Sequence, residues 1–445
     1  MNTARAGWAE IEITPPPGLP MGGRGPQFTP GASVLDPLIA QALVLEDHGG
    51  RRTLWVSMDM IGLSYSMSSM FRYELAAMTG IPYEAIILNF SHTHSGPMTG
   101  FEGYATETPK PEALQVYEAG LIPGTVRMAC EAVENLQPVT VRLHQGQSDI
   151  GINRRRRNQA GEMEMNPNPD GVYNPDLWVL DIAAKAGGDR CVVFCYGCHP
   201  VIVYGFAYDG ISADYPGVCR GRLEEALGQG THTQFIQGLA GNVRPRLLAD
   251  PEAGRFRKST PEDPVAVGED LAGDVIDALN REGETLELDL AAAAGFALAR
   301  RDRNRILPLE HWQSLAESGD EMSRNLGRYW TNRFRSGLSP VQVVPWGIGL
   351  VRLTREHRIA WLSGEVLAEW LGCLRDWLED ERLIAWGYCQ DGRGYMPTDE
   401  IIPEGGYEVI RSNTFNKTGP GPFVAGINET ARQGFLGLAR QLEEG

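Results

Sequence analysis

The sequence predicts an α/β fold in which mixed β-sheets are flanked by helices. Strand-like and helix-like segments alternate along the chain, 42% of its 445 residues are hydrophobic, and no linker or internal repeat interrupts it. We therefore expect one contiguous domain, from about residue 5 to residue 443 of the 1–445 chain, with its functional site in the loops at the strand ends.

In the first half of the chain, short apolar or alternating runs predict strands, and apolar residues at helical spacing predict helices. Gly80 and Pro138 mark where two of these helices should stop. The expected strands are residues 7–13, 36–45, 52–60, 86–90, 139–147 and 189–199, and the expected helices are residues 68–78, 126–136 and 212–227.

The second half continues the alternation. A strand from residue 231 leads into a Gly-rich turn ending near residue 246, and such turns present backbone N–H groups well. A helix should begin at Glu365, because leucines and tryptophans recur at helical spacing after it. The other expected elements are helices at 265–280 and 429–443, a polar helical segment at 309–335, and strands at 286–296, 341–353 and 358–362.

Residues 151–176 show no periodicity and contain many turn-forming residues, so a long loop is expected there. The loop carries four consecutive arginines, Arg154 to Arg157, in an otherwise acidic chain. Such a run is either a solvated face or a clamp for a carboxylate, sulfate or phosphate.

Composition excludes several classes of partner. The net charge of −17 argues against nucleic acid and anionic membranes, which this surface would repel. The sequence has no apolar run of membrane-spanning length and no secretory signal at its start, so we expect a cytoplasmic protein without membrane insertion. Its seven scattered cysteines suit reduced thiols. The sequence is also compatible with a homo-oligomer.

The segment AIILNFSHTHSGP, residues 85–97, changes abruptly from a buried strand to a polar loop. In extended backbone, residues i and i+2 point to the same side, so His92 and His94 should leave the strand end together. They could form part of a metal site. The structural alternative is that one histidine caps the strand and the other is solvated.

Three more potential metal ligands follow apolar segments: His199, Glu365 and Tyr395. Two imidazoles and a carboxylate are a donor set that catalytic zinc uses. Glu365 has a structural alternative, since a carboxylate in a first helical turn complements the helix dipole. The CxxCH text at 195–199 is also the signature of c-type haem attachment, but here it lies in an apolar strand of a chain without an export signal.

Short motifs in a specific order make the chain resemble the neutral/alkaline ceramidase family over nearly the whole catalytic region. The motifs are ITPPPGLPMGG (13–23), DPL (36–38), SHTHSGP (91–97), INR (152–154), CHP (198–200), QGLAGNVRP (237–245), SGE (363–365), GYMPT (394–398) and GGYEV (405–409).

The resemblance implies one zinc ion per chain and assigns residue roles. Matching the family's motifs puts its metal ligands at His92, His199, Glu365 and Tyr395. It also implies an oxyanion-stabilising role for His94, and substrate contacts for Arg154 and for Tyr407, the family's second active-site tyrosine.

The chain departs from the family at two points. Arg244 stands where the family has its nucleophilic serine, and a guanidinium cannot act as a nucleophile. The sequence given also ends before any C-terminal immunoglobulin-like domain. Cleavage of membrane ceramide is therefore not expected.

The resulting hypothesis is a zinc-dependent hydrolase that cleaves an amide or related acyl bond of a small anionic substrate by metal-activated water. His94 and Tyr407 would stabilise the oxyanion, while Arg244 and Arg154 would hold the anionic group. One alternative is a zinc-dependent lyase acting on an acidic uronate sugar, with a tyrosine or histidine removing the α-proton. Another is a catalytically inactive protein that kept the fold for binding.

Overall fold

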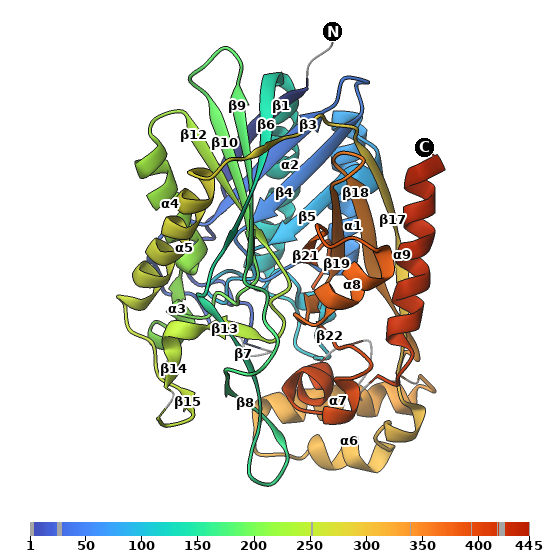
Figure 1. Cartoon of the computed structure of the whole chain (residues 1–445). Coiled ribbons are helices and arrows are strands. Elements are labelled where there is room, and N and C mark those ends of the chain that lie inside the picture. The colour runs from blue at the N-terminus through green and yellow to red at the C-terminus, as the bar shows by residue number, and fades with distance from the viewer. Residues whose placement is uncertain are drawn as a thin grey trace.

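The computed structural model describes residues 4–24, 29–250, 252–338, 340–392, 394–415, 417 and 423–444. Its largest element is a thirteen-stranded sheet (Figure 1). The strand order is β12 (Thr231–Gln237), β10 (Arg190–Tyr196), β9 (Asp176–Ala184), β6 (Gln137–Gln147), β1 (Arg5–Glu12), β3 (Ile39–Glu46), β4 (Arg52–Met58), β5 (Ile86–Phe90), β21 (Ile384–Cys389), β19 (Arg358–Ser363), β18 (Val343–Arg352) and β17 (Ala291–Arg300), with β16 (Glu284–Thr285) beside β6.

Both strand directions occur in this sheet. The pairs β4–β5, β10–β12 and β19–β21 are parallel, whereas the long pairs β1–β3, β6–β9 and β17–β18 are antiparallel. Parallel neighbours need a crossover segment, and α1 and α4 supply it for the first two pairs. The predicted class, mixed β-sheet with flanking helices, is confirmed.

Three groups of helices cover the sheet (Figure 1). Phe71 of α1 and Val126 of α2 share a core with Val56 of β4. The other two groups pack in the same way, α4 and α5 on β9, β10 and β12, and α8 and α9 on β17 to β19. The bounds are α1 Tyr65–Thr79, α2 Glu112–Glu134, α4 Asp214–Leu227, α5 Asp263–Leu279, α8 Trp370–Leu378 and α9 Ile427–Glu444.

A further core lies between two parts of the sheet. It joins Trp55 of β4 and Ile87 of β5 to Val193 of β10 and Ile236 of β12, although these pairs of strands lie far apart in the strand order. Strand β12 also contacts β4, β5 and β21. The sheet therefore turns back on itself, and this brings the ends of β5, β10 and β12 together.

Short elements gather at that end of the sheet (Figure 1). They include three small sheets: β13–β7–β8, β14–β15 and β20–β22. The bounds are β7 Gly151–Arg157, β8 Met163–Asn168, β13 Val243–Pro245, β14 Ala249–Asp250, β15 Arg255–Phe256, β20 Glu365–Val366, β22 Tyr395–Met396, β2 Ser33–Val34, β11 Gly210–Ile211, α3 Val203–Phe206, α6 Leu309–Leu315 and α7 Glu321–Arg335. Short 3₁₀ turns and one π-helical turn, Tyr407–Arg411, complete the loops.

Several local predictions were wrong. Residues 151–176 are not a loop, because β7 and β8 form an antiparallel hairpin there, and β9 begins at Asp176. Arginines fill the positions on β7 that hydrophobic residues would normally occupy, so the strand shows no apolar period. Glu365 does not begin a helix, since β20 pairs in parallel with β22 and α8 begins only at Trp370. The strand expected at 286–296 runs instead from Ala291 to Arg300.

In the parts of the chain that the structure describes, no helix combines the length and the apolar character that crossing a bilayer requires.

Candidate metal centre

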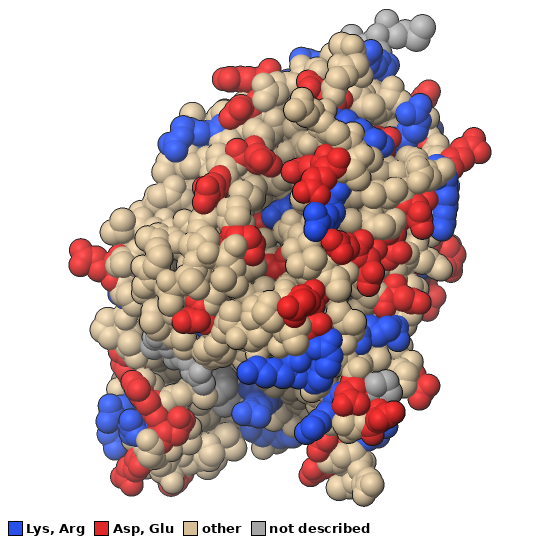
Figure 2. All heavy atoms as spheres, turned by 90° about the vertical axis from the view of Figure 1, so that its left-hand side faces the viewer, with Lys and Arg blue, Asp and Glu red and all other residues tan. Residues whose placement is uncertain are grey.

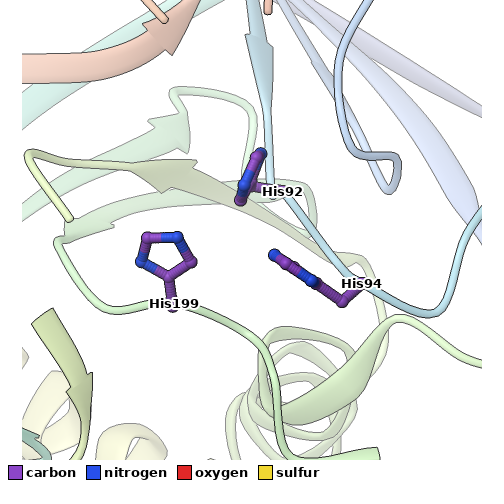
Figure 3. A group of neighbouring side chains, drawn as sticks. All are labelled: His92, His94 and His199. Carbon is purple, nitrogen blue, oxygen red and sulfur yellow. The ribbon is translucent and has the colours of Figure 1, made fainter. Parts of the chain in front are cut away.

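Three histidines converge where β5 and β10 end. His92 and His94 follow β5, and His199 follows β10 (Figure 3). The rings of His92 and His199 lie 5.2 Å apart, centroid to centroid, and the rings of His92 and His94 lie 5.1 Å apart. His92 has a φ of 66°, which non-glycine residues rarely adopt, so packing around this buried residue holds a strained backbone.

Backbone carbonyls fix two of these rings. His92 Nδ1 lies 2.7 Å from the Ile61 oxygen, and His199 Nδ1 lies 2.6 Å from the Ala240 oxygen. A carbonyl only accepts hydrogen bonds, so each Nδ1 carries the proton and each Nε2 keeps a free lone pair. This is the arrangement in which a second hydrogen bond orients a metal-ligating histidine.

Both free lone pairs point at the same carboxylate oxygen. Glu365 Oε2 lies 3.3 Å from His92 Nε2 and 3.2 Å from His199 Nε2, and Tyr395 Oη lies 3.5 Å from His199 Nε2. Ligand atoms about 2.0–2.1 Å from a tetrahedral ion lie about 3.3 Å from one another, so these spacings suit zinc. The four residues proposed as ligands are therefore brought together.

The electrostatics of the cluster also suit a cation. Burial alone would raise the pKa of Glu365, but its interactions with the side chains of His92 and His199 outweigh burial and hold this pKa well below its usual range. Burial, assisted by the charge of Arg154, lowers the pKa of His199 to about 4. At neutral pH Glu365 is therefore a carboxylate and His199 a neutral imidazole, the forms that bind metal.

His94 offers a second way to complete a ligand set. One nitrogen from each of His92, His94 and His199 can be chosen so that all three lie within 4.8 Å of one another. This spacing is wider than the 3.2–3.3 Å contacts of Glu365, so the geometry favours the carboxylate as third ligand. His94 Nε2 is buried and has no partner among the described residues, which leaves it available to a substrate atom.

Arg154 supports Tyr395 rather than facing solvent. Its Nη2 donates to Tyr395 Oη at 2.9 Å and its Nε to Glu408 Oε1 at 2.9 Å. The guanidinium of Arg155 donates to the other Glu408 oxygen at 2.7 Å and also contacts Glu404. The first two arginines of the run are thus buried in ion pairs, which is neither the solvated face nor the free anion clamp that the sequence suggested. Arg156 and Arg157 are exposed.

A cavity of about 130 Å³ opens above the cluster. Its lining includes His92, His94, Glu365 and Tyr395, together with Tyr104 and Tyr407. The ring of Tyr407 lies 5.5 Å from that of Tyr395. Burial raises the pKa of Tyr407 to about 12, so its phenol remains a hydrogen-bond donor at neutral pH.

Arg244 is not among the described residues that line this cavity. It belongs to β13, which pairs with β7 beside Ile152, and its guanidinium lies 4.6 Å from the ring of Phe256. Burial, assisted by the charge of Arg154, lowers its pKa to about 10. It remains protonated at neutral pH and lies beside the metal cluster rather than within it.

Two buried amides join the strands that carry the cluster. Asn89 of β5 donates to the backbone oxygens of Gln237 at 3.2 Å and Gly387 at 2.8 Å. Gln237 Nε2 donates to the oxygens of Ser91 and Cys198, each at 2.9 Å. The residues directly before His92 and His199 are therefore bonded to one side chain, which sets the spacing of the two histidines.

Sequence reasoning missed four residues near the cluster: Tyr104, Tyr388, Glu408 and Arg24. The ring of Tyr388 lies 4.5 Å from that of His92, and Arg24 donates to the His94 oxygen at 3.3 Å. Glu408 directly follows Tyr407 in GGYEV, and Arg24 directly follows the ITPPPGLPMGG motif. Their position next to recognised motifs could therefore have identified these two residues as part of the site. Tyr388 lies in an apolar strand and gives no such signal.

The fold and the histidine cluster together define a ceramidase-like α/β protein. The structure superposes on a neutral ceramidase from Pseudomonas aeruginosa with a TM-score of 0.72 and 19% identity, over 98% of this chain and 73% of that one. It superposes on a ceramidase complexed with C2 with a TM-score of 0.74 and 18% identity, over 100% of this chain and 76% of that one. No protein-family model and no curated protein matches the sequence. The predicted ceramidase-like fold is thus confirmed.

Proposed function

We propose that this protein is a zinc-dependent hydrolase that cleaves an amide or related acyl bond of a small anionic substrate. The observation that carries the proposal is the convergence of His92 Nε2 and His199 Nε2 on Glu365 Oε2, at 3.3 and 3.2 Å, beside a cavity. The fold that the chain shares with two ceramidases supports this reaction class, because the family that the sequence resembles hydrolyses amides.

His92, His199, Glu365 and Tyr395 would hold the ion. Zinc bound there supplies a Lewis acid and lowers the pKa of water. Arg154 keeps Tyr395 in place through the 2.9 Å bond to its hydroxyl, and Glu408 in turn holds Arg154. This second layer limits the movement of the tyrosine and fixes its distance from His199.

His94 and Tyr407 are proposed to stabilise negative charge on the substrate carbonyl oxygen. The buried, unpartnered His94 Nε2 and the Tyr407 phenol both border the cavity. Donors fixed in a buried site stabilise developing charge without the reorganisation that water would need. Arg244 is absent from the described lining and cannot replace a serine nucleophile, so the proposed attacking group is water.

The lyase alternative needs a base strong enough to remove an α-proton. Burial raises the pKa of Tyr407 to about 12, so this tyrosine carries little phenolate at neutral pH. This favours hydrolysis over a tyrosine-dependent elimination.

A reducing compartment, such as the cytoplasm, is proposed as the location. All seven cysteines are free in the structure, and five of them are buried. Buried free thiols without disulfide partners are typical of proteins kept reduced.

The test begins with the metal content of purified wild type, His92→Ala and a control, His48→Ala, which changes an exposed histidine in the β3–β4 turn. We expect about one equivalent of zinc in wild type and the control, and none in His92→Ala. Each protein is then assayed with N-acyl amino acids, N-acyl amino sugars and uronic-acid oligosaccharides.

Release of a free amine or acid by the zinc-loaded proteins alone would support the hydrolase. Absorbance growth near ~230 nm with the uronates would establish the lyase instead, because elimination leaves an unsaturated product. Zinc binding without turnover of any substrate would favour the binding protein, and full turnover by metal-free protein would reject a metal-dependent reaction.

A further inference from the structure

Arg24 is a buried cation without a carboxylate partner. Only 6% of its surface is exposed, and its Nη2 donates to the backbone oxygen of His94 at 3.3 Å. Its Nε and Nη1 have no hydrogen-bond partner among the described residues. The guanidinium lies over the rings of Tyr208 and Tyr204, at 4.1 and 5.4 Å. Buried arginines are rare unless they are paired, and the charge of Asp209, which acts on this one, does not outweigh the burial that lowers its pKa.

Arg244, which is half-buried, also lacks a carboxylate partner. Its Nε is buried without a partner, and the only polar contact of its Nη1 among the described residues is the sulfur of Met165, at 3.9 Å. Phe256 provides the facing ring. No Asp or Glu side chain forms a salt bridge with Arg24 or Arg244, and every Asp and Glu of the chain belongs to the residues that the structure describes.

Three other buried arginines do have carboxylate partners. Arg154 and Arg155 share the Glu408 carboxylate, at 2.9 and 2.7 Å, and Arg220 pairs with Asp59 at 2.5 Å. Arg72 is also buried but instead donates to the backbone oxygens of Ile86 and Tyr83, at 3.1 and 2.7 Å. In a chain of net charge −17, Arg24 and Arg244 each have a single polar contact among the described residues and no salt bridge. Figure 2 shows Lys and Arg side chains gathered around a hollow at the lower end of one face, below a surface with many acidic groups.

Tyr204 links both arginines to the metal cluster. Burial raises its pKa, and the charges of Arg24 and Arg244 both oppose that shift, so both cations act on this hydroxyl. Its ring lies 5.7 Å from the ring of His94, which in turn lies 5.9 Å from that of His199. The rings of Tyr204 and His94 are thus neighbours, so a small molecule bound beside Tyr204 would adjoin the cluster.

We propose that Arg24 and Arg244 bind a carboxylate of the substrate beside Tyr204, so that the substrate is a small amide of the N-acyl amino acid class. The proposal rests on the hydrolase function above and deepens it, because it names the group that the site recognises. Guanidinium donors match the two oxygens of a carboxylate, and the aromatic rings beside them exclude water that would weaken the interaction.

The probe is 4-oxopentanoate, which has the carbonyl-to-carboxylate spacing of an N-acetylated glycine but no bond that the site can hydrolyse. Its methyl ester is the neutral match. Binding of each to the zinc-loaded full-length protein is measured by isothermal titration calorimetry, with the variants Arg24→Gln and Arg244→Gln and the control Arg222→Gln. Arg222 lies on α4 and pairs at the surface with Glu225.

We expect wild type to bind the acid at least about tenfold more tightly than the ester. Each glutamine variant should weaken binding of the acid by about 10- to 100-fold, as loss of charge-assisted hydrogen bonds predicts, and leave the ester unchanged. Arg24→Lys should restore part of the loss, and the Arg222 control should match wild type. Circular dichroism checks folding, and the more exposed Arg244 provides a second variant if Arg24→Gln does not fold.

Equal affinity for acid and ester, no binding of the acid to wild type, or unchanged binding by both glutamine variants would overturn the proposal. The binding and activity measurements together distinguish failure of this proposal from failure of the hydrolase function. Carboxylate binding without cleavage of any amide would reject the hydrolase and keep this site. Amide cleavage with KM values unaffected by Arg24→Gln and Arg244→Gln would keep the hydrolase and reject this site.

Discussion

His199 Nε2 lies 3.2 Å from Glu365 Oε2, although 166 residues separate these two side chains in the sequence. Three features produce the contact: the end of β10, the parallel β20–β22 pair and the backbone carbonyl that holds His199 Nδ1. The contact brings a carboxylate and a neutral imidazole together without a proton between them. A cation placed there would be attracted to both.

Removal of metal should therefore destabilise the protein without unfolding it. Zinc added back to chelator-treated wild type, at about 100 times its Kd, should stabilise the fold by about 2.7 kcal/mol. Glu365→Gln should lose most of this increment because it removes the shared anion. Differential scanning calorimetry measures the effect, and an equal zinc-induced shift in wild type and Glu365→Gln would contradict the assigned ligand set.

Glu408→Gln should destabilise the fold strongly, because it leaves the buried Arg154 and Arg155 without their shared counter-ion. We expect a loss of about 3–5 kcal/mol, together with reduced activity as Tyr395 loses its support. Glu404→Gln is the matched control, since that carboxylate is 29% exposed and contacts only the second of these buried arginines. Urea unfolding of both variants checks the prediction, which fails if the two losses are equal.

Gly23→Ala should displace His94. A Cβ at this position would meet His94 Nδ1 at 2.5 Å, and the residue has a φ of 74°. Gly18→Ala is the control, because its φ is 100° but nothing lies within 4 Å of the added atom. Both substitutions introduce backbone strain of about 1–2 kcal/mol, yet only Gly23→Ala should lose activity. Thermal unfolding and turnover measured side by side would refute this if both variants lost activity equally.

Asp47 should contribute stability that acid removes. Burial would raise its pKa, but backbone N–H groups of Arg51 and Leu290 and the Arg51 side chain outweigh burial and lower the pKa below its usual value. The folded state therefore holds the proton less tightly than the unfolded state. The contribution is present above about pH 4, the pKa of the unfolded chain, and is lost as pH falls through the lower folded pKa.

Asp47→Asn tests this dependence. At pH 7 we expect it to destabilise the fold by about 1–3 kcal/mol, and the difference from wild type should shrink as pH falls from about 4 through the lower folded pKa, because Asp47 then becomes neutral as asparagine is. Urea titrations from pH 3 to pH 7 measure the difference. If the difference in the free energy of unfolding did not depend on pH, the charge of Asp47 would not contribute to stability.

The periodicity of apolar residues was sufficient to predict many of the strands and helices. The strand predicted at 86–90 is β5, and the helix predicted at 429–443 lies within α9, Ile427–Glu444. The β7–β8 hairpin was not predictable in this way, because Arg154 and Arg155 are buried by pairing with Glu408, which lies more than 250 residues away. Short-range patterns carry no information about such a partner.

The site was partly predictable for a related reason. His92, His199, Glu365 and Tyr395 stand in recognisable motifs, and the structure brings them into contact, although their roles stay predictions. The short strand at Glu365 was missed because it pairs with residues 30 positions downstream rather than with its own neighbours. Tyr388 was missed because only the folded chain places its ring against His92.

The amides of Asn89 and Gln237 tie the ends of β5, β10 and β21 together from inside the molecule. None of these bonds involves the segments around Arg24, Tyr104 or Tyr407, which border the site from outside. Substitutions in those outer segments can therefore alter what the protein recognises while the spacing of His92 and His199 stays the same. A laboratory selection for new substrates should accordingly start from the rim and leave the two amides untouched.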